Sequence, residues 1–161
     1  MEYRVVVYEE KYQDAIIDLI LPIQQKEFNV PITIQDQPDL QNISASYQHG
    51  NGNFWVALSE DEVVGTIALI DFNNDRVALR KMFVHHRHRG KEHGVAQQLF
   101  NELKKWCRLK GVKEIFLGTI DTMHAAHRFY LKNNFKELSK ADLPKSFPLV
   151  RVDNKFFQCI L

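Results

Sequence analysis

Hydrophobic residues near the N-terminus change from a strand-like to a helix-like spacing. Residues 3–8 carry consecutive valines between two tyrosines, which predicts a strand. Apolar residues then recur every three or four positions over 11–26, which predicts a first helix. The stretch 28–37 has neither spacing and is expected to be irregular. Pro38 suits the first turn of a short second helix, whose apolar face is Leu40, Ile43 and Tyr47.

Strand-like segments follow, separated by short polar turns. They are residues 54–58, 63–70 and 77–84. The turns at 59–62 and 73–75 are composed of Ser, Asp, Glu and Asn, which are common in loops. Because the connections are short, we expect these strands to form an antiparallel meander.

The second half of the chain alternates between helices and strands. After Gly94, charged residues separate the apolar positions, which predicts an amphipathic helix that ends near Gly111. The remaining elements are a short apolar strand at 115–117, a helix at 123–133, and strands at 135–138 and 156–161.

The resulting order, β-α-α-β-β-β-α-β-α-β-β, predicts an α/β fold with a mixed sheet. The passage through 77–120 should be a right-handed crossover that joins two parallel strands and adds a parallel pair to the antiparallel meander. The final strand, 156–161, is apolar and is expected at a sheet edge. Pairing of that edge with a second subunit would give a homodimer.

Length and composition narrow the class of protein. The chain has 161 residues, which fits a single domain over 1–161. Lys and Arg number 21 against 20 Asp and Glu, so no overall charge favours a nucleic-acid or membrane partner. The two cysteines are too few for a disulfide framework, and no apolar run near the N-terminus suits a signal peptide. We therefore expect a soluble, cytoplasmic protein.

The most informative segment is 82–96, where a strand gives way to a basic turn and then to a helix. The unpaired N–H groups and positive dipole end of a helix N-terminus bind phosphate groups. Gly94 lets the backbone approach a ligand closely, and Arg87, Arg89 and Lys91 add positive charge around it. A phosphate-bearing ligand is one interpretation, and a connecting turn with a solvated basic rim is the other.

Two motifs resemble those of the GNAT superfamily of N-acetyltransferases, in its small single-domain bacterial type. Residues 89–96, with the run Arg-Gly-Lys and then Gly-Val-Ala, resemble the family's Arg/Gln-x-x-Gly-x-Gly/Ala acetyl-coenzyme A signature. Residues 125–135, which follow the strand Ile-Phe-Leu-Gly-Thr, resemble its A-x-x-F-Y-x-x-x-G-F run. The resemblance implies a transferase that uses acetyl-coenzyme A (acetyl-CoA) as cosubstrate. The residues that would bind acetyl-CoA are then Met82, Phe83, Val84, Arg89, Gly90, Lys91, Glu92, His93, Gly94, Val95, Ala96, Thr119 and Ala126.

Some positions depart from the family pattern. Lys91 stands where the family usually has Arg or Gln, while Arg89 implies a longer loop, so the sequence leaves open which cation meets the pyrophosphate. Met123 replaces a common Asn. Asn134 replaces the usual Gly before Phe135, and Asn tolerates the left-handed conformation better than most residues.

The resemblance also implies direct attack of a primary amine on the thioester. Tyr130 would act as the catalytic acid that gives a proton to the departing thiolate, although a tyrosine on an amphipathic helix is also a common core residue. Asp121, His124 and His127 lie nearby by motif position, and the sequence assigns none of them as the base. The alternative function is a non-catalytic acetyl-CoA-binding sensor or interaction module of the same fold.

The acceptor, a small-molecule or peptide amine, is expected to bind between the irregular 26–37 stretch, the short helix after it and the loop at 141–150. Polar and aromatic residues there suit a cationic amine but equally suit an ordinary surface; they are Glu27, Phe28, Asp36, Asp39 and Tyr47. Histidines crowd residues 85–93, but no carboxylate or cysteine stands at a metal-ligand spacing, so no metal is predicted. The same basic run matches no nucleic-acid-binding motif.

Overall fold

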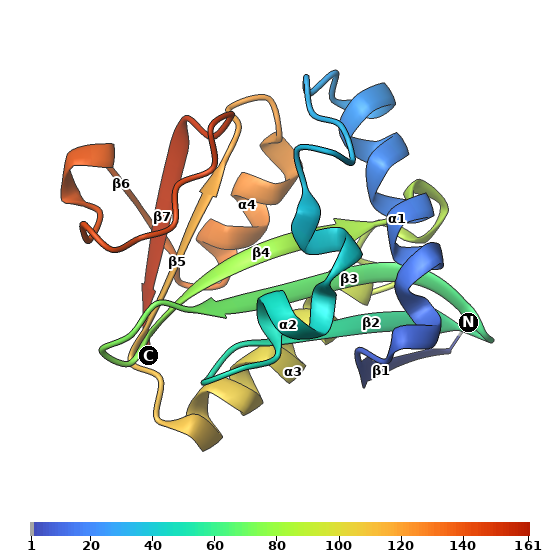
Figure 1. Cartoon of the computed structure of the whole chain (residues 1–161), viewed down its shortest axis with the longest axis horizontal. Helices are drawn as coiled ribbons and strands as arrows, with labels where there is room; N and C mark the ends of the chain where they lie inside the picture. The colour runs from blue at the N-terminus through green and yellow to red at the C-terminus, as the bar shows by residue number, and fades with distance from the viewer. Residues whose placement is uncertain (1) are drawn as a thin grey trace.

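A seven-stranded mixed sheet runs through the molecule, which the computed structural model describes over residues 2–161 (Figure 1). The strand order is β1-β2-β3-β4-β5-β7-β6, and each neighbouring pair is antiparallel except β4 and β5, which are parallel. The predicted meander and parallel pair are both confirmed. The strands are β1 (Tyr3–Val7), β2 (Asn53–Ser59), β3 (Glu62–Asp71), β4 (Arg76–Val84), β5 (Glu114–Thr119), β6 (Lys136–Leu138) and β7 (Lys155–Ile160).

Helices cover both faces of the sheet. α1 and α2 pack on one face, and α3 and α4 on the other (Figure 1). The helices are α1 (Gln13–Pro22), α2 (Ile43–Tyr47), α3 (Val95–Lys110) and α4 (His124–Lys132), with 3-10 turns at Glu10–Tyr12, Pro38–Gln41, His86–His88 and Lys140–Asp142. Within residues 2–161, none of the helices is long and apolar enough to cross a bilayer.

The first predicted helix changes character along its length. A 3-10 turn leads into α1, and a π-helical turn at Ile23–Glu27 follows it. The change comes directly after Pro22, whose missing N–H and bulky ring disturb the α-helical hydrogen-bond ladder. The stretch 28–37 then runs without regular structure, apart from bends and turns, as its sequence predicts.

Each predicted apolar helix face is buried. Leu40, Ile43 and Tyr47 are at most 2% exposed and pack with α1 against β2 and β3. On the opposite face, α3 buries five side chains against the sheet; they are Val95, Leu99, Phe100, Leu103 and Cys107. Burial of large apolar side chains contributes about 1.5–3 kcal/mol each, so these two layers hold the helices on the sheet.

The expectation that the final strand lies at a sheet edge is wrong. β7 lies between β5 and β6, with Gly118↔Phe156 on one side and Leu138↔Phe156 on the other. The short strand β6 folds back and occupies the side that was expected to be free. The edges are therefore β1 and the three-residue β6, and a dimer formed through an open β7 edge is excluded.

Candidate functional site

β4 and β5 separate part-way along the sheet. Their parallel register ends at Ala78↔Phe116, although β4 continues to Val84. Beyond Ala78, the backbone edge of β4 that faces β5 is not occupied by that strand. An unoccupied strand edge presents N–H and C=O groups to a ligand.

A β-bulge lies just beyond the point of separation. The pairs Ala68↔Arg80 and Thr66↔Phe83 leave β4 with one more residue than β3 between them. Lys81, inside the bulge, has a φ of 51°, which is rare for a residue with a side chain. The Thr66 hydroxyl donates a hydrogen bond of 2.6 Å to the Lys81 carbonyl and helps to hold this conformation. The bulge changes the direction of the side chains that follow it in β4. Adjacent residues of this strand therefore lie on both faces of the sheet.

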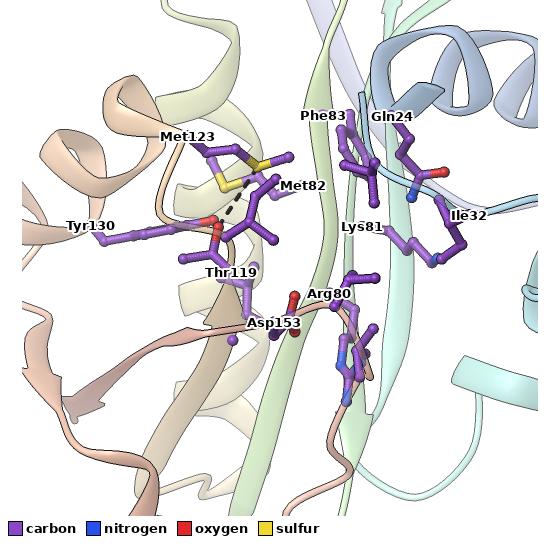
Figure 2. A pocket seen from close by; sticks show the side chains of 16 residues that line it. Gln24, Ile32, Arg80, Lys81, Met82, Phe83, Thr119, Met123, Tyr130 and Asp153 are labelled. Carbon is purple, nitrogen blue, oxygen red and sulfur yellow. Dashed lines mark hydrogen bonds between the residues drawn. The ribbon is translucent and has the colours of Figure 1, made fainter. Parts of the chain in front are cut away.

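A cavity of ≈ 120 Å³ opens where the two strands part. Figure 2 shows side chains from β4, β5 and α4 on one side of it, and side chains from β4 and the segment after α1 on the other. The first side consists of Met82, Thr119, Met123 and Tyr130. The second side consists of Gln24, Ile32, Arg80, Lys81 and Phe83.

Tyr130 is 5% exposed and reaches the cavity from α4. Its ring packs against Phe135 and Phe157, with centroids 5.5 and 5.6 Å apart, which fixes its direction. The hydroxyl has no hydrogen-bond partner among residues 2–161. Burial, together with the charge of Asp153, raises the pKa of Tyr130 well above its usual value. The side chain is therefore a neutral phenol at neutral pH and still holds its proton.

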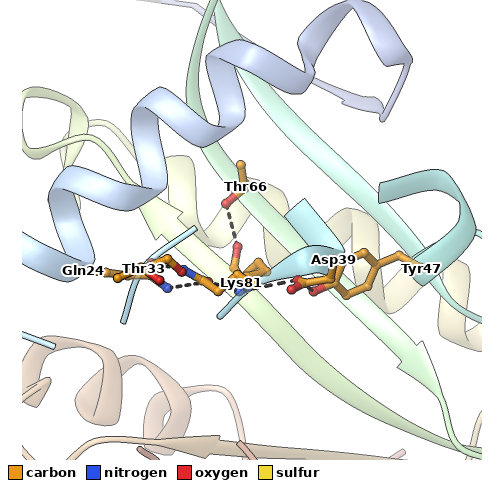
Figure 3. Close-up of polar contacts among 7 residues, drawn as sticks. Gln24, Thr33, Asp39, Tyr47, Thr66 and Lys81 are labelled. Carbon is orange, nitrogen blue, oxygen red and sulfur yellow. Dashed lines mark hydrogen bonds and ion pairs between the residues drawn. The ribbon is translucent and has the colours of Figure 1, made fainter. Parts of the chain in front are cut away.

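Lys81 and Gln24, on the second side of the cavity, belong to a polar network that extends away from it (Figure 3). Lys81 Nζ lies 3.5 Å from Asp39 Oδ2 and also donates to Gln37 Oε1. The same Asp39 oxygen accepts a hydrogen bond of 2.5 Å from the Tyr47 hydroxyl. Gln37 and Gln24 exchange hydrogen bonds of 2.8 and 3.0 Å through their amides. The Lys81 ammonium is thus held in place although burial lowers its pKa.

Arg80 carries a second, partly buried cation beside this network. One of its terminal nitrogens donates to the Pro148 carbonyl, and the guanidinium carbon lies 5.7 Å from the centroid of the Phe147 ring. Its Nε is buried and has no hydrogen-bond partner among residues 2–161. Burial lowers the pKa of Arg80, and an arginine still keeps its charge at neutral pH.

Asp153 brings a carboxylate into the same cavity. It lies over Gly118 of β5: a Cβ on this glycine would come within 2.6 Å of Asp153 Oδ2, so only glycine leaves room for the carboxylate. The carboxylate accepts no hydrogen bond from any described residue. Burial raises its pKa to about 6, against the opposing pull of Arg80 and Lys81.

The turn that leads into α3 has an open backbone. Gly94, the residue before the first turn of α3, has a φ of 67°, and Gly90 has a φ of 104°. A Cβ atom added at position 94 would meet no atom of residues 2–161 nearer than the Lys91 carbonyl oxygen at 4.0 Å. The first N–H groups of α3 have no acceptor within the helix, so they are available beside this open space.

Arg89 and Lys91, the two candidates for contact with the pyrophosphate, differ in their surroundings. Arg89 Nε donates to the Val84 carbonyl at 2.7 Å, and its Nη1 pairs with Glu27 Oε1 at 2.7 Å. Arg89 therefore ties the turn to β4 and to the segment after α1. Lys91 is exposed, and no described residue forms an ion pair with it. This arrangement favours Lys91 as the side chain available to an anion.

The histidines of the turn are part of its framework. The Tyr3 hydroxyl lies 2.9 Å from His88 Nδ1 and 3.0 Å from His93 Nδ1, which connects the turn to β1. His85 and His86 stack with ring centroids 4.3 Å apart. Over residues 2–161, no group of three or more His, Cys, Asp or Glu side chains is arranged to hold a metal ion.

The three candidates for the catalytic base do not line the cavity. His127 Nε2 lies 2.9 Å from the Ile120 carbonyl, and burial lowers its pKa, so this histidine supports the turn before α4. His124 and Asp121 are exposed. Asp153 was missed because it stands in an irregular loop before the last strand, where no spacing or motif distinguishes it from a surface aspartate.

The sequence matches the model of the Acetyltransferase (GNAT) family over residues 17–135. The chain belongs to this family. The crystal structure of a GNAT acetyltransferase from Staphylococcus aureus Mu50 superimposes with a TM-score of 0.95 and 38% identity, covering 99% of both chains. The PaiA N-acetyltransferase of Thermoplasma acidophilum, solved with coenzyme A, has the same fold with a TM-score of 0.76 and 14% identity, covering 100% of both chains.

A curated relative is N-acetylaspartate synthetase of Danio rerio, which is 32% identical over 106 residues. That match covers 65% of this chain and 37% of the relative. The chain thus spans little more than a third of that relative's length, and activity and acceptor do not carry over with the similarity.

The GNAT resemblance read from the sequence is therefore confirmed, as is the predicted fold class. Asn134, which replaces the family's glycine, has a φ of 70° and so adopts the left-handed conformation expected of it. Met123 lies 3.7 Å from the Thr119 hydroxyl, which donates to its sulfur. Ala126 lies on α4 and packs against the core beside Tyr130. The structure brings Met82, Phe83, Thr119 and Tyr130 to the cavity, and places 89–96 at the open turn beyond the end of β4.

The expected acceptor site is divided among several roles. Val30 and Ile32, from the irregular stretch, do line the cavity. Asp39 and Tyr47 hold Lys81, while Glu27 pairs with Arg89. Asp36 binds the backbone and hydroxyl of Thr33, and Phe28 lines a separate hollow with Asn29 and Pro31.

Proposed function

We propose that this protein transfers an acetyl group from acetyl-CoA to a primary amine by direct attack. One observation carries the proposal: the parallel pair β4–β5 opens after Ala78 into a cavity lined by Tyr130, whose hydroxyl has no hydrogen-bond partner in the described part of the chain. From that opening, β4 leads to the open turn at Gly94. An elongated ligand with phosphates at one end and an acyl thioester at the other fits this path.

The residues of the path suit acetyl-CoA. The edge of β4 from Met82 to Val84, where the Val84 carbonyl already accepts a hydrogen bond from Arg89, offers backbone groups that would pair with the amides of the pantetheine arm. The N-terminus of α3 would hold the pyrophosphate through its N–H groups, and Lys91 would add a charge. Thr119 and Met123 would bound the arm from the β5 side. Acetyl-CoA would supply the activated acyl group as a thioester.

Tyr130 would act as the proton donor to the sulfur leaving group. Its phenol is neutral at neutral pH, its ring is fixed by two phenylalanines, and its hydroxyl is free to bind a ligand atom. The raised pKa makes the phenol a weaker acid than a thiol, so proton transfer to sulfur is uphill and would assist the reaction mainly as negative charge develops on sulfur. No covalent enzyme intermediate is required, because the amine would attack the thioester carbonyl carbon directly.

The test is thermal unfolding with acetyl-CoA, with ATP as a phosphate-bearing control. Ligand at 100 times its Kd stabilises a protein by ~2.7 kcal/mol, or about 5–11 °C for a domain of this size. A rise of that order with acetyl-CoA and none with ATP supports the cosubstrate. An equal rise with both would reduce the site to a general anion site.

Turnover separates the enzyme from the alternative, a non-catalytic acetyl-CoA sensor. Release of coenzyme A that depends on added amine supports the transferase. Tight binding of acetyl-CoA with no amine-dependent release, and with no effect of Tyr130→Phe, would support the sensor.

A further inference from the structure

The cavity carries charges of both signs: the cations come from β4, and the carboxylate comes from the loop before β7. Arg80 and Lys81 are adjacent in β4 and lie on the side of the segment after α1 (Figure 2). Asp153 lies over β5, between these cations and the side that contains Thr119 and Tyr130 (Figure 2). A ligand in the cavity therefore meets a carboxylate near the proposed reaction centre and two cations farther from it.

Some of these charges lack partners within the protein. Lys81 has Asp39, but Arg80 makes one hydrogen bond and leaves its buried Nε unpaired. The Asp153 carboxylate accepts no hydrogen bond from a described residue. A fully buried polar atom without a partner, such as the Arg80 Nε, destabilises the fold and needs an explanation beyond folding, and partial burial also disfavours the charge of Asp153. A ligand with complementary charges would satisfy both.

We propose that the acceptor is a small molecule with both an amine and a carboxylate, as in an amino acid. Asp153 would face the amine, while Arg80 and Lys81 would bind the carboxylate. This inference rests on the proposed acetyl transfer. The cavity volume of ≈ 120 Å³ favours a small acceptor, since an engineered cavity of about 150 Å³ holds benzene.

Asp153 would also act as the proton acceptor. The ammonium of the acceptor gives one proton to the Asp153 carboxylate and becomes a free amine. The nitrogen then forms a bond to the acetyl carbonyl carbon as the carbon–sulfur bond breaks, and the leaving thiolate takes the proton of Tyr130. The second nitrogen proton returns to Tyr130, and Asp153 releases its proton to solvent, so the enzyme is restored.

Matched acceptors test the proposal. Release of coenzyme A is measured with the common L-amino acids, with the α-amide of each one, and with spermidine and tyramine as amines that lack a carboxylate. Hydrogen bonds to charged groups contribute about 1.5–3 kcal/mol, so kcat/KM for the accepted amino acid should exceed that for its amide roughly ten- to a hundredfold.

The outcomes distinguish this inference from the proposed function. A preference for spermidine or tyramine, or equal rates for acid and amide, would overturn the inference and leave the acetyl transfer standing. Binding of acetyl-CoA with turnover of no amino acid would also overturn it. If acetyl-CoA does not bind at all, the proposed function itself fails.

Arg80→Gln shows whether Arg80 reads the carboxylate or only supports the fold. The variant should reduce the acid-to-amide ratio of kcat/KM toward one while the acetyl-CoA thermal shift is unchanged. Arg76→Gln is the control, because Arg76 lies at the start of β4 and pairs with Glu114 outside the cavity. Equal loss of activity with acid and amide in Arg80→Gln would mean a structural role and would contradict the proposal.

Asp153→Asn tests the other end of the acceptor. It removes the proton acceptor but keeps the shape, so kcat should fall at least tenfold while acetyl-CoA still stabilises the protein. Asp18→Asn, on the exposed face of α1, is the control. Full activity in Asp153→Asn would rule out its role as proton acceptor.

Discussion

Two glycines with the same backbone conformation allow a matched test of the acetyl-CoA site. Gly94 stands before α3 with a φ of 67°, and Gly111 follows α3 with a φ of 73°. Neither has an atom closer than 4.0 Å to the position of an added Cβ. The variants Gly94→Trp and Gly111→Trp therefore introduce the same side chain and the same backbone strain at opposite ends of one helix.

The magnitudes of the two effects are separable. A side chain in the left-handed region costs ~1–2 kcal/mol, which lowers Tm by roughly 2–8 °C in a domain of this size. Both variants should show this loss without ligand. Acetyl-CoA at 100 times its Kd should then raise Tm by about 5–11 °C in the wild type and in Gly111→Trp, and by nothing in Gly94→Trp. The indole at position 94 would occupy the open space beside the helix N-terminus.

The assay is thermal unfolding of the three proteins with and without acetyl-CoA. Circular dichroism of each protein at 20–25 °C, a range chosen to lie below unfolding, confirms that the variants are folded. If folded Gly94→Trp shows the same acetyl-CoA shift as Gly111→Trp, the phosphate end of the ligand does not lie at this turn, and the proposed path along β4 is wrong.

Three further predictions address individual side chains. Tyr130→Phe should lower kcat about 10²-fold or more with little change in Tm, because the Tyr130 hydroxyl makes no hydrogen bond within the described structure. Stopped-flow or steady-state assays measure kcat, and an unchanged kcat would mean that Tyr130 is only a core residue. Asp153→Asn should stabilise the protein by up to about 3 kcal/mol above pH 7 and by little near pH 4, because folding raises the carboxyl pKa from 3.8 to about 6 and the wild type loses stability as the pH rises through that interval. Urea unfolding across this pH range measures the difference in stability, and a difference that does not depend on pH would refute the assigned burial of Asp153. Asp39→Asn should destabilise the fold by about 3 kcal/mol, because the Lys81 ammonium loses its carboxylate partner. Urea unfolding measures this loss, and a loss below about 0.5 kcal/mol would mean that solvent already screens the ion pair.

The helices and most strands follow from side-chain spacing alone. Periodic apolar residues predict α3 and its buried face, and the glycine after it marks its end. The open turn at Gly94 is also visible in the sequence, since a glycine before an amphipathic helix is a local feature. These elements depend on interactions between residues close in the chain.

The order of strands and the acceptor side of the cavity depend on contacts between distant residues. The position of β7 inside the sheet depends on its pairing with β6. The spacing of apolar residues in 156–161 does not predict that pairing. The bulge in β4 cannot be predicted from a glycine, because the residue with the positive φ is Lys81. Asp153 acquires its role from Gly118, whose missing side chain leaves room for the carboxylate.

The most direct test of the account is transfer of an isotopically labelled acetyl group. The protein is incubated with acetyl-CoA labelled in the acetyl carbons and with a mixture of L-amino acids, and the products are measured by mass spectrometry together with free coenzyme A. Acetyl transfer to an amino acid predicts a labelled N-acetyl product in an amount equal to the coenzyme A released, with both lost in Gly94→Trp. Release of coenzyme A with labelled acetate as the only product, or no release with any amino acid, would contradict transfer to an amino acid.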